Sequence, residues 1–208
     1  KSKQATSRKK ALEKLNLEDM QVSMRKYPYI AFKPEREPGD IILEVENLTK
    51  RNEAGELLFD NLFLRFNKGE KIAVLSRNAS AVTALFNILA GEDTDFEGRF
   101  QYGQTISTQY LPNDNSAYFS GDQDQNLIDW LREYSKDKDE SFIRGFLGRM
   151  LFGGEEVFKR AGVLSGGEKV RCMMSKIMLS NPNFLILDEP TNHLDLESIT
   201  ALNNGMQE

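Results

Sequence analysis

The chain has 208 residues, 39% of them hydrophobic, with 13 Phe and 7 Met, which is enough for one sizeable α/β domain and an appendage. Its single cysteine excludes a disulfide framework and a cysteine-based zinc site. No apolar run approaches the roughly 18 residues that cross a bilayer and no signal-peptide pattern opens the chain. We therefore expect a cytoplasmic protein without membrane insertion. The net charge of the chain is −5.

The beginning of the chain is a basic arm. Residues 1–36 carry ten Lys or Arg against four Asp or Glu, so the remaining 172 residues carry −11. This asymmetry indicates a polyanionic partner for the arm, although a solvated linker explains the same charges. Helix formers fill residues 4–15, which predicts a helix there. Three prolines between residues 27 and 38 then predict an extended connector and a domain boundary near residue 38.

Strand and helix patterns alternate after this boundary. Apolar and polar residues alternate at 41–48 and at 62–66, as in half-buried strands, and 71–75 has the composition of a short strand. Residues 80–90 predict a helix that ends before Gly91, which suits the left-handed position after a helix. A strand, a loop and a helix in this order form the context that a phosphate-binding loop requires.

A predicted helical insertion covers residues 124–160. Its apolar residues recur at helical spacing and form two stripes, the first with Leu127, Trp130, Leu131 and Tyr134, the second with Phe142, Phe146 and Met150 beside Ile143, Leu147 and Leu151. We interpret Trp130 as a core residue rather than as part of a ligand site.

The next motif starts a helix with two glycines. It consists of Leu164, Ser165, Gly166, Gly167 and Glu168. A serine followed three residues later by glutamate is a capping box before the amphipathic run. Capping alone leaves the glycines unexplained, because each costs roughly 1 kcal/mol in a helix relative to alanine. Since glycine lets backbone N–H groups approach an anion at the positive end of the helix dipole, we interpret this motif as phosphate-recognising. Cys172, later in the helix, is interpreted as inert packing.

Two adjacent carboxylates follow a short apolar strand. Phe184–Leu187 is typical of a buried parallel sheet, and Asp188 and Glu189 come directly after it. Open α/β sheets bind ligands at this end of their strands. We expect Asp188 to hold Mg²⁺, directly or through water, and Glu189 to polarise the attacking water. His193 lies in the loop after Pro190, where we expect a contact or positioning role.

These motifs resemble those of the ATP-binding cassette (ABC) superfamily. Residues 164–168 resemble its signature, 185–189 its Walker B strand, and Leu194 with Asp195 its D-loop. The string Pro-Thr-Asn-His-Leu-Asp at 190–195 is most similar to the ABC-F branch, in its translational-throttle and YbiT-like subgroup. The resemblance covers nearly the whole chain.

The resemblance implies a fold and a set of partners. The fold class is α/β, an ABC-type nucleotide-binding domain at 39–208 with a P-loop NTPase-like sheet core, an antiparallel β subdomain and a helical subdomain at about 120–180. We expect a second cassette, incomplete at its C-terminus and preceded at 1–38 by the end of a basic linker helix. The implied cofactors are ATP and Mg²⁺. The implied partners are another cassette, in the same polypeptide or in a homodimer, and the ribosome or its RNA through residues 1–26.

The phosphate loop departs from the family pattern Gly-x-x-Gly-x-Gly-Lys-Ser/Thr-Thr. The equivalent residues are Ser76, Arg77, Asn78, Ala79, Ser80, Ala81, Val82, Thr83 and Ala84. All three glycines and the lysine are replaced, and Thr83 remains as the expected Mg²⁺ ligand. The added Cβ atoms cost roughly 1–2 kcal/mol per strained residue, and the lost lysine contact is worth about 1.5–3 kcal/mol. These losses move a micromolar ATP site toward millimolar.

Two further family positions are altered. The adenine-stacking aromatic is replaced by Arg51 or Asn52, and the glutamine of the Q-loop corresponds to Asn113, with Gln109 as the alternative. We therefore predict a degenerate site at 76–84, and a signature that serves ATP held by another cassette.

The resemblance implies ATP hydrolysis by the full-length protein, coupled to the ribosome. One alternative is the ATP-binding subunit of a membrane transporter, against which the Asn-His-Leu-Asp string and the basic arm argue. Another is a non-catalytic pseudo-cassette used for dimerisation, against which the intact carboxylates at 188 and 189 argue.

Overall fold

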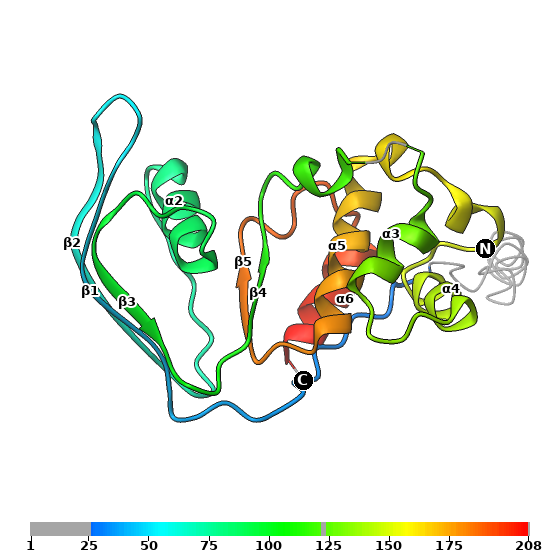
Figure 1. Ribbon diagram of the computed structural model, residues 1–208, viewed down its shortest axis with the longest axis horizontal. Coiled ribbons are helices and arrows are strands. Elements are labelled where there is room, and N and C mark those ends of the chain that lie inside the picture. Colours follow the sequence, from blue (N-terminus) through cyan, green and yellow to red (C-terminus); the bar gives the residue numbers. More distant parts are fainter. Residues whose placement is uncertain (1–25, 122–123, 208) are drawn as a thin grey trace, which may run out of the picture.

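The computed structural model describes residues 26–121 and 124–207, and its strands form two separate sheets (Figure 1). The strands are β1 (Ile41–Arg51), β2 (Leu57–Asn67), β3 (Glu97–Tyr102), β4 (Thr108–Leu111) and β5 (Phe184–Leu187). The α-helices are α2 (Ala79–Ala90), α3 (Leu127–Tyr134), α4 (Glu140–Arg149), α5 (Gly166–Ser180) and α6 (Leu196–Gln207). Short 3₁₀ helices are η2 (Ser116–Phe119), η3 (Gly154–Phe158) and η4 (Ala161–Val163).

The first sheet is antiparallel, in the order β2-β1-β3. It contains the strands expected at 41–48 and 62–66, each longer than its sequence pattern. Its inner face packs against α2 through one apolar cluster with Leu43, Val45, Leu85 and Ile88. The helix expected at 80–90 is confirmed, and Gly91 caps it with φ 79° as predicted.

The second sheet pairs β4 and β5 in parallel. The strand expected at Phe184–Leu187 is confirmed in both its bounds and its parallel pairing. Figure 1 shows α2 between the two sheets, with the remaining helices beyond the far face of β4 and β5. Tyr110 and Ile186 of this sheet belong to the apolar cluster of α2, and the Tyr110 hydroxyl donates to Asn87 Oδ1 at 2.9 Å. Side chains rather than strand pairing therefore join the two sheets.

The prediction of a strand at 71–75 is wrong. These residues form no strand, and the Leu75 side chain is 91% exposed. A strand needs a neighbouring strand to pair with its backbone N–H and C=O groups. Among the described residues, no strand of either sheet pairs with residues 71–75. The loop before α2 therefore lacks the strand that the sequence predicted as its support.

The helical insertion is confirmed in outline but consists of shorter elements, with α3 and α4 followed by η3 and η4. The first predicted stripe packs inward, and Trp130 is buried as expected. The second stripe is wrong in part, because Phe142 is 41% exposed while Ile143 and Leu147 form the buried face of α4. The apolar face of this short helix is thus narrower than the sequence pattern suggested.

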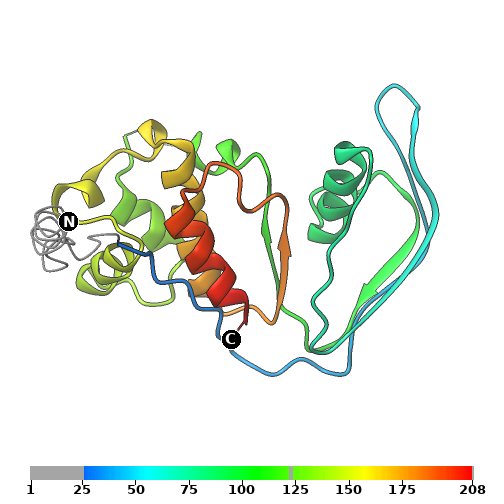
Figure 2. The same cartoon turned by 180° about the vertical axis from the view of Figure 1, so that it is seen from behind.

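Residues 26–38 form the extended connector that the prolines predicted. The Tyr29 N–H donates to the Arg149 carbonyl at 2.8 Å, and Ile30 is buried against α6, where a Cβ on Gly205 would approach the Ile30 carbonyl oxygen to 2.6 Å. Figure 2 shows α6 beside this connector. The helix expected at 4–15 lies outside the described residues. None of the helices that the structure describes has the length and apolarity needed to cross a membrane.

Candidate functional site

The N-terminus of α2, where the phosphate loop should end, is capped by the chain itself. Asn78 is the N-cap residue, and its Oδ1 accepts a hydrogen bond from the Ser80 N–H at 3.1 Å. The Asn78 carbonyl accepts another from the Ala81 N–H at 3.1 Å. Free N–H groups at a helix start are the usual donors to a phosphate. Here the Asn78 side chain supplies the oxygen that a phosphate would otherwise supply.

The two expected Mg²⁺ ligands lie side by side and contact each other. The Thr83 hydroxyl on α2 donates to Asp188 Oδ2 at 2.8 Å, across the interval between α2 and β5. Asp188 is 2% exposed. Burial raises the pKa of the Asp188 carboxyl and the charge of Glu189 raises it further, while the Thr83 hydrogen bond opposes both. A hydroxyl and a carboxylate are oxygen ligands of the kind that Mg²⁺ prefers, so this pair fits the metal in its donor set.

Glu189 is held by two amide side chains. Its Oε2 accepts from Asn192 Nδ2 at 2.6 Å and from Asn113 Nδ2 at 3.3 Å. Asn192 Nδ2 also lies 3.1 Å from Asn113 Oδ1. Asn113, the preferred Q-loop candidate, therefore lies at the carboxylate, whereas the alternative, Gln109, lies within β4. Asn192 was missed by the sequence reasoning. Asn192 follows Glu189 by three residues in a loop that contains a proline, and this spacing could have indicated a turn in which the two side chains meet.

The positions expected to replace the adenine-stacking aromatic stabilise a turn. Arg51 Nη1 donates to the Gly55 carbonyl at 3.2 Å, and Asn52 Nδ2 donates to Glu56 Oε2 at 2.7 Å. Both interactions close the connection between β1 and β2. Neither side chain offers an aromatic face to a base.

The start of α5 is the capping box that its sequence predicted. The Glu168 N–H donates to Ser165 Oγ at 3.4 Å, and the Ser165 N–H donates back to Glu168 Oε2 at 2.8 Å. Lys159 Nζ donates to Glu168 Oε1 at 2.8 Å. Burial alone raises the pKa of Glu168, but the hydrogen bonds from Lys159 and Ser165 outweigh it and hold this pKa at about 2.

The two glycines of this motif also lie against the loop that follows β5. A Cβ on Gly166 would lie 2.9 Å from His193 Cγ, and a Cβ on Gly167 would lie 2.7 Å from the His193 carbonyl oxygen. The glycines therefore have a packing role in addition to any role toward an anion. His193 makes the contact that its loop position predicted, and it connects the start of α5 with the residues that follow Glu189.

The other residues of the predicted motifs cap a helix or pack in the core. Asp195 Oδ1 accepts from the Ser198 N–H at 2.8 Å at the start of α6, and the side-chain and backbone hydrogen bonds from Ser198 lower the Asp195 pKa. Leu194 and Leu164 pack against the helical core. Cys172 is fully buried in that core, as expected, and burial raises the pKa of its thiol.

Because the pKa of Glu168 is lowered in the folded chain, the free energy of unfolding depends on pH in the acidic range. Because the folded pKa of about 2 lies below the usual value near 4.3, this carboxylate stabilises the fold above about pH 4.5 and loses its contribution as the pH falls toward 2. We expect the urea midpoint to decline over this interval, and the decline to be smaller in Glu168→Gln. The exposed Glu155→Gln, which removes the same charge from η3, is the matched control. Equal slopes for the two variants would contradict the assignment.

Comparisons with known proteins give consistent results. Residues 59–192 match the family profile described as ABC transporter. The chain is 62% identical, over 99% of its length, to the ABC transporter ATP-binding protein YkpA of Bacillus subtilis (strain 168), of which it covers 38%. It is 39% identical, over its whole length, to the ATP-binding protein YbiT of Escherichia coli O157:H7, of which it covers 39%. It is 33% identical, over 82% of its length, to the energy-dependent translational throttle protein EttA of Haemophilus influenzae, of which it covers 31%.

The chain thus spans less than two fifths of the length of these relatives. Two solved structures, each 23% identical, share its fold. One is a metal-chelate type ABC transporter in an inward-facing conformation, with a TM-score of 0.61 over 80% of this chain and 68% of that one. The other is cbiO1 from Clostridium perfringens, part of the ABC transporter complex cbiONQ, with a TM-score of 0.54 over 80% and 72%.

These likenesses confirm the expected α/β fold of an ABC-type nucleotide-binding domain. The matched residues extend from β2 to the loop after β5 and contain the segments predicted as phosphate loop and signature, together with the paired carboxylates Asp188 and Glu189. The chain therefore belongs to the ATP-binding cassette family, in the ABC-F branch that its sequence resembles.

Proposed function

We propose that this chain is a cassette of an ABC-F ATPase whose own phosphate loop is degenerate and whose signature completes the ATP site of a partner cassette. ATP would lie between the Walker motifs of the partner and residues 164–168 of this chain. Hydrolysis would then be an activity of the paired cassettes. Glu189 would be the catalytic carboxylate, and Thr83 and Asp188 the Mg²⁺ ligands, of this chain's own weaker site.

The contrast between two helix starts carries this proposal. At α2, the Asn78 side chain accepts from the Ser80 N–H, and Ala79, Ala81 and Val82 replace two glycines and the lysine. At α5, Ser165 and Glu168 cap each other, and Gly166 and Gly167 present a first turn without Cβ atoms. Only the second helix start keeps the sequence that allows close approach of a phosphate.

The polar contacts around Asp188 and Glu189 support the same division. Asp188 is paired with Thr83, and Glu189 with Asn113 and Asn192, so each group already has hydrogen-bond donors from the chain. A nucleotide bound here would have to replace some of these contacts without a lysine to offset the cost. The site fits Mg²⁺ in its ligand types but fits a triphosphate poorly.

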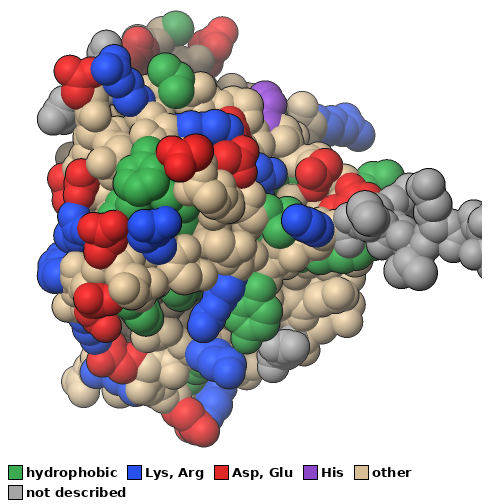
Figure 3. Space-filling model, turned by 90° about the vertical axis from the view of Figure 1, so that its right-hand side faces the viewer, with side chains coloured by type: hydrophobic (Ala, Val, Ile, Leu, Met, Phe, Trp, Pro, Cys, Tyr) green, Lys and Arg blue, Asp and Glu red, His purple; other side chains and the backbone are tan. Residues whose placement is uncertain are grey.

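We further propose that the paired cassettes act on the ribosome, with the basic arm as the RNA contact. The throttle protein EttA is named for an effect on translation, and residues 1–26 belong to the segment that carries the excess of Lys and Arg. Figure 3 shows positive and negative side chains interspersed over the face that it presents. Such a mixed face attracts RNA phosphates less than a basic arm does, and binding through the arm should weaken steeply with salt.

A transporter subunit is the second candidate, favoured by one observation. Both solved structures named above come from ABC transporters. At 23% identity they support the fold alone. Co-sedimentation with ribosomes, with and without ATP, separates the two candidates, because a transporter subunit would not sediment in an ATP-dependent manner.

Restoring the phosphate loop should restore nucleotide binding. We expect the 208-residue chain to bind Mg²⁺–ATP no more tightly than about 1 mM, since several kcal/mol are lost at this loop. A variant with Ser76→Gly, Ala79→Gly, Ala81→Gly, Val82→Lys and Ala84→Thr should bind at least about 100-fold more tightly. Isothermal titration calorimetry measures both constants. The matched control keeps Val82 and carries the other four changes. Micromolar binding by the unsubstituted chain would rule out a degenerate site.

A further inference from the structure

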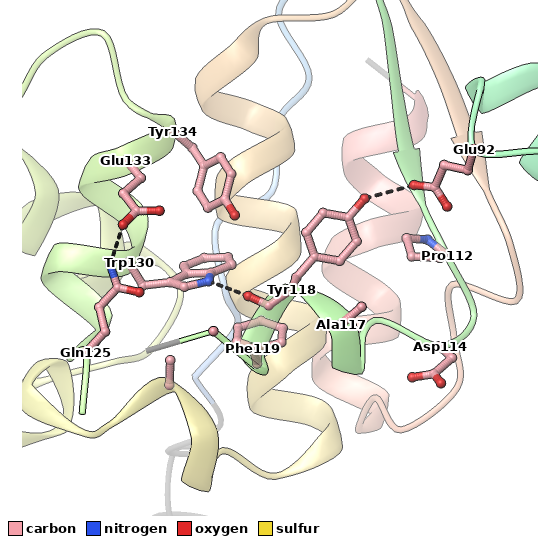
Figure 4. Close-up of a pocket in the computed structure, with 12 residues that line it drawn as sticks. Glu92, Pro112, Asp114, Ala117, Tyr118, Phe119, Gln125, Trp130, Glu133 and Tyr134 are labelled. Carbon is pink, nitrogen blue, oxygen red and sulfur yellow. Dashed lines mark hydrogen bonds between the residues drawn. The ribbon is translucent and has the colours of Figure 1, made fainter. Parts of the chain in front are cut away.

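An open cavity of about 540 Å³ lies between η2 and α3, and its lining includes Pro112 and Asp114, the two neighbours of Asn113 in sequence (Figure 4). Aromatic and acidic side chains dominate its lining, with Tyr118, Phe119, Trp130, Tyr134, Glu92, Asp114 and Glu133. Among the described residues that line it, none is Lys or Arg. A cavity of this size suits a small ligand or a short piece of polypeptide.

The rings of the cavity are fixed in place by their own contacts. Phe119 and Trp130 stack with ring centroids 4.8 Å apart, and Tyr134 meets Trp130 edge-on at 5.0 Å. Trp130 Nε1 donates to the Tyr118 carbonyl at 2.8 Å, which ties α3 to η2. Phe119 and Trp130 are themselves buried, so the half-buried rings of Tyr118 and Tyr134 supply the aromatic surface of the cavity, and these contacts hold that surface in place.

Carboxylates flank this surface on two sides. Figure 4 shows Glu133 beside Tyr134, with Glu92 at the Tyr118 hydroxyl and Asp114 on the same side as Glu92, beyond Ala117. Glu133 Oε1 accepts from Gln125 Nε2 at 2.6 Å, and Glu92 Oε1 accepts from the Tyr118 hydroxyl at 3.0 Å. Each of these bonds uses one carboxylate oxygen, so each carboxylate is oriented and retains a second oxygen for a ligand.

The same rings already stabilise cations of the chain. Lys176 Nζ lies 4.1 Å from the centre of the Tyr118 ring and 4.9 Å from that of Tyr134. Lys169 Nζ lies 5.7 Å from the centre of Phe119. Lys176 lines a smaller cavity of about 150 Å³ and not the larger one. The three carboxylates outnumber these two lysines, so the larger cavity keeps a negative balance that favours a cationic ligand.

We propose that the larger cavity binds the guanidinium group of an arginine carried by a basic polypeptide segment. A planar guanidinium stacks on an aromatic ring and donates in-plane pairs of hydrogen bonds to a carboxylate, whereas an ammonium acts as a point charge. The volume of about 540 Å³ exceeds the needs of one side chain and leaves room for the neighbouring residues of a peptide. This site does not depend on the nucleotide chemistry proposed above.

The chain provides its own reporter, because Trp130 is its single tryptophan and lines the cavity. The probe is a five-residue peptide, acetyl-Gly-Arg-Gly-Arg-Gly-amide, titrated into the 208-residue chain while tryptophan fluorescence is recorded. A matched peptide with citrulline in place of arginine keeps the shape and removes the charge. We expect a saturable signal for the arginine peptide and at least tenfold weaker binding of the citrulline peptide.

Variants test which residues carry the binding. Glu133→Gln should raise the dissociation constant at least tenfold, whereas Glu53→Gln, which removes the same charge in the distant β1–β2 turn, should leave it unchanged. Tyr134→Leu is a second variant, should Glu133→Gln fail to fold in a thermal melt, and it should also weaken binding at least tenfold. Equal binding of the two peptides, equal effects of the two Glu variants, or displacement of the peptide by spermidine at the same affinity would each overturn the proposal.

Discussion

Replacing Ser165 with arginine in a protein that pairs this cassette with its partner should lower ATP hydrolysis about 100-fold. Ser165 caps α5 and precedes the two glycines, so a long side chain here obstructs the approach of a phosphate to the first-turn N–H groups. Loss of a single group that stabilises developing charge costs about 100-fold or more in other enzymes. Steady-state phosphate release is the measurement.

The matched variant is Ser165→Thr, which keeps the hydroxyl and the cap and should retain most of the activity. Ribosome co-sedimentation in the absence of ATP should be the same for both variants, because the basic arm is untouched. Unchanged hydrolysis after Ser165→Arg would exclude the proposed role of the signature in trans. A thermal melt of Ser165→Arg shows whether a loss of hydrolysis comes from a loss of folding.

Adding a single methyl group at Gly167 should destabilise the fold by about 1–2 kcal/mol. Alanine normally gains roughly 1 kcal/mol over glycine in a helix, but here its Cβ would lie 2.7 Å from the His193 carbonyl oxygen. Overpacking of this kind costs about 1–3 kcal/mol. Chemical denaturation of the 208-residue chain measures the change.

Gly166→Ala gives a matched comparison, because its Cβ would meet the ring and the Cβ of His193 instead of the backbone. His193→Ala removes the ring but keeps the Cβ of residue 193, which would lie 3.1 Å from the added Cβ, so Gly166→Ala should be less destabilising in the His193→Ala background than alone. The loop backbone remains in both cases, so Gly167→Ala should destabilise either background. A cycle of these variants isolates the coupling energy. Additive effects of Gly166→Ala and His193→Ala would contradict the observed contact.

Local patterns predicted the local elements of this fold well. The amphipathic stretch at 80–90, the capping box at 165–168 and the apolar strand at 184–187 each encode their structure within a few neighbouring residues. Segment 71–75 failed because its strand-like composition says nothing about whether a partner strand lies beside it. Strand formation depends on a neighbour that is distant in sequence.

The candidate site shows the same limit. Its carboxylates and the serine at 165 could be picked out from the sequence. The hydrogen bonds from Asn192 and Asn113 to Glu189 could not, because they depend on how the loops fold. The close contact of Gly166 and Gly167 with His193 also joins segments that no short-range pattern links. The glycines were assigned to an anion alone because their packing partner lies more than twenty residues away.

The separation of the two sheets has a consequence for how the molecule opens. The antiparallel sheet with α2 and the parallel pair with its helices each close their own backbone ladders, and side-chain contacts such as Tyr110–Asn87 and Thr83–Asp188 bridge them. Units of this kind unfold locally with their own free energies. Separating the two sheets would also expose the apolar cluster that Tyr110 and Ile186 share with α2, and the Thr83–Asp188 bond, at the boundary, reports whether the two units move together.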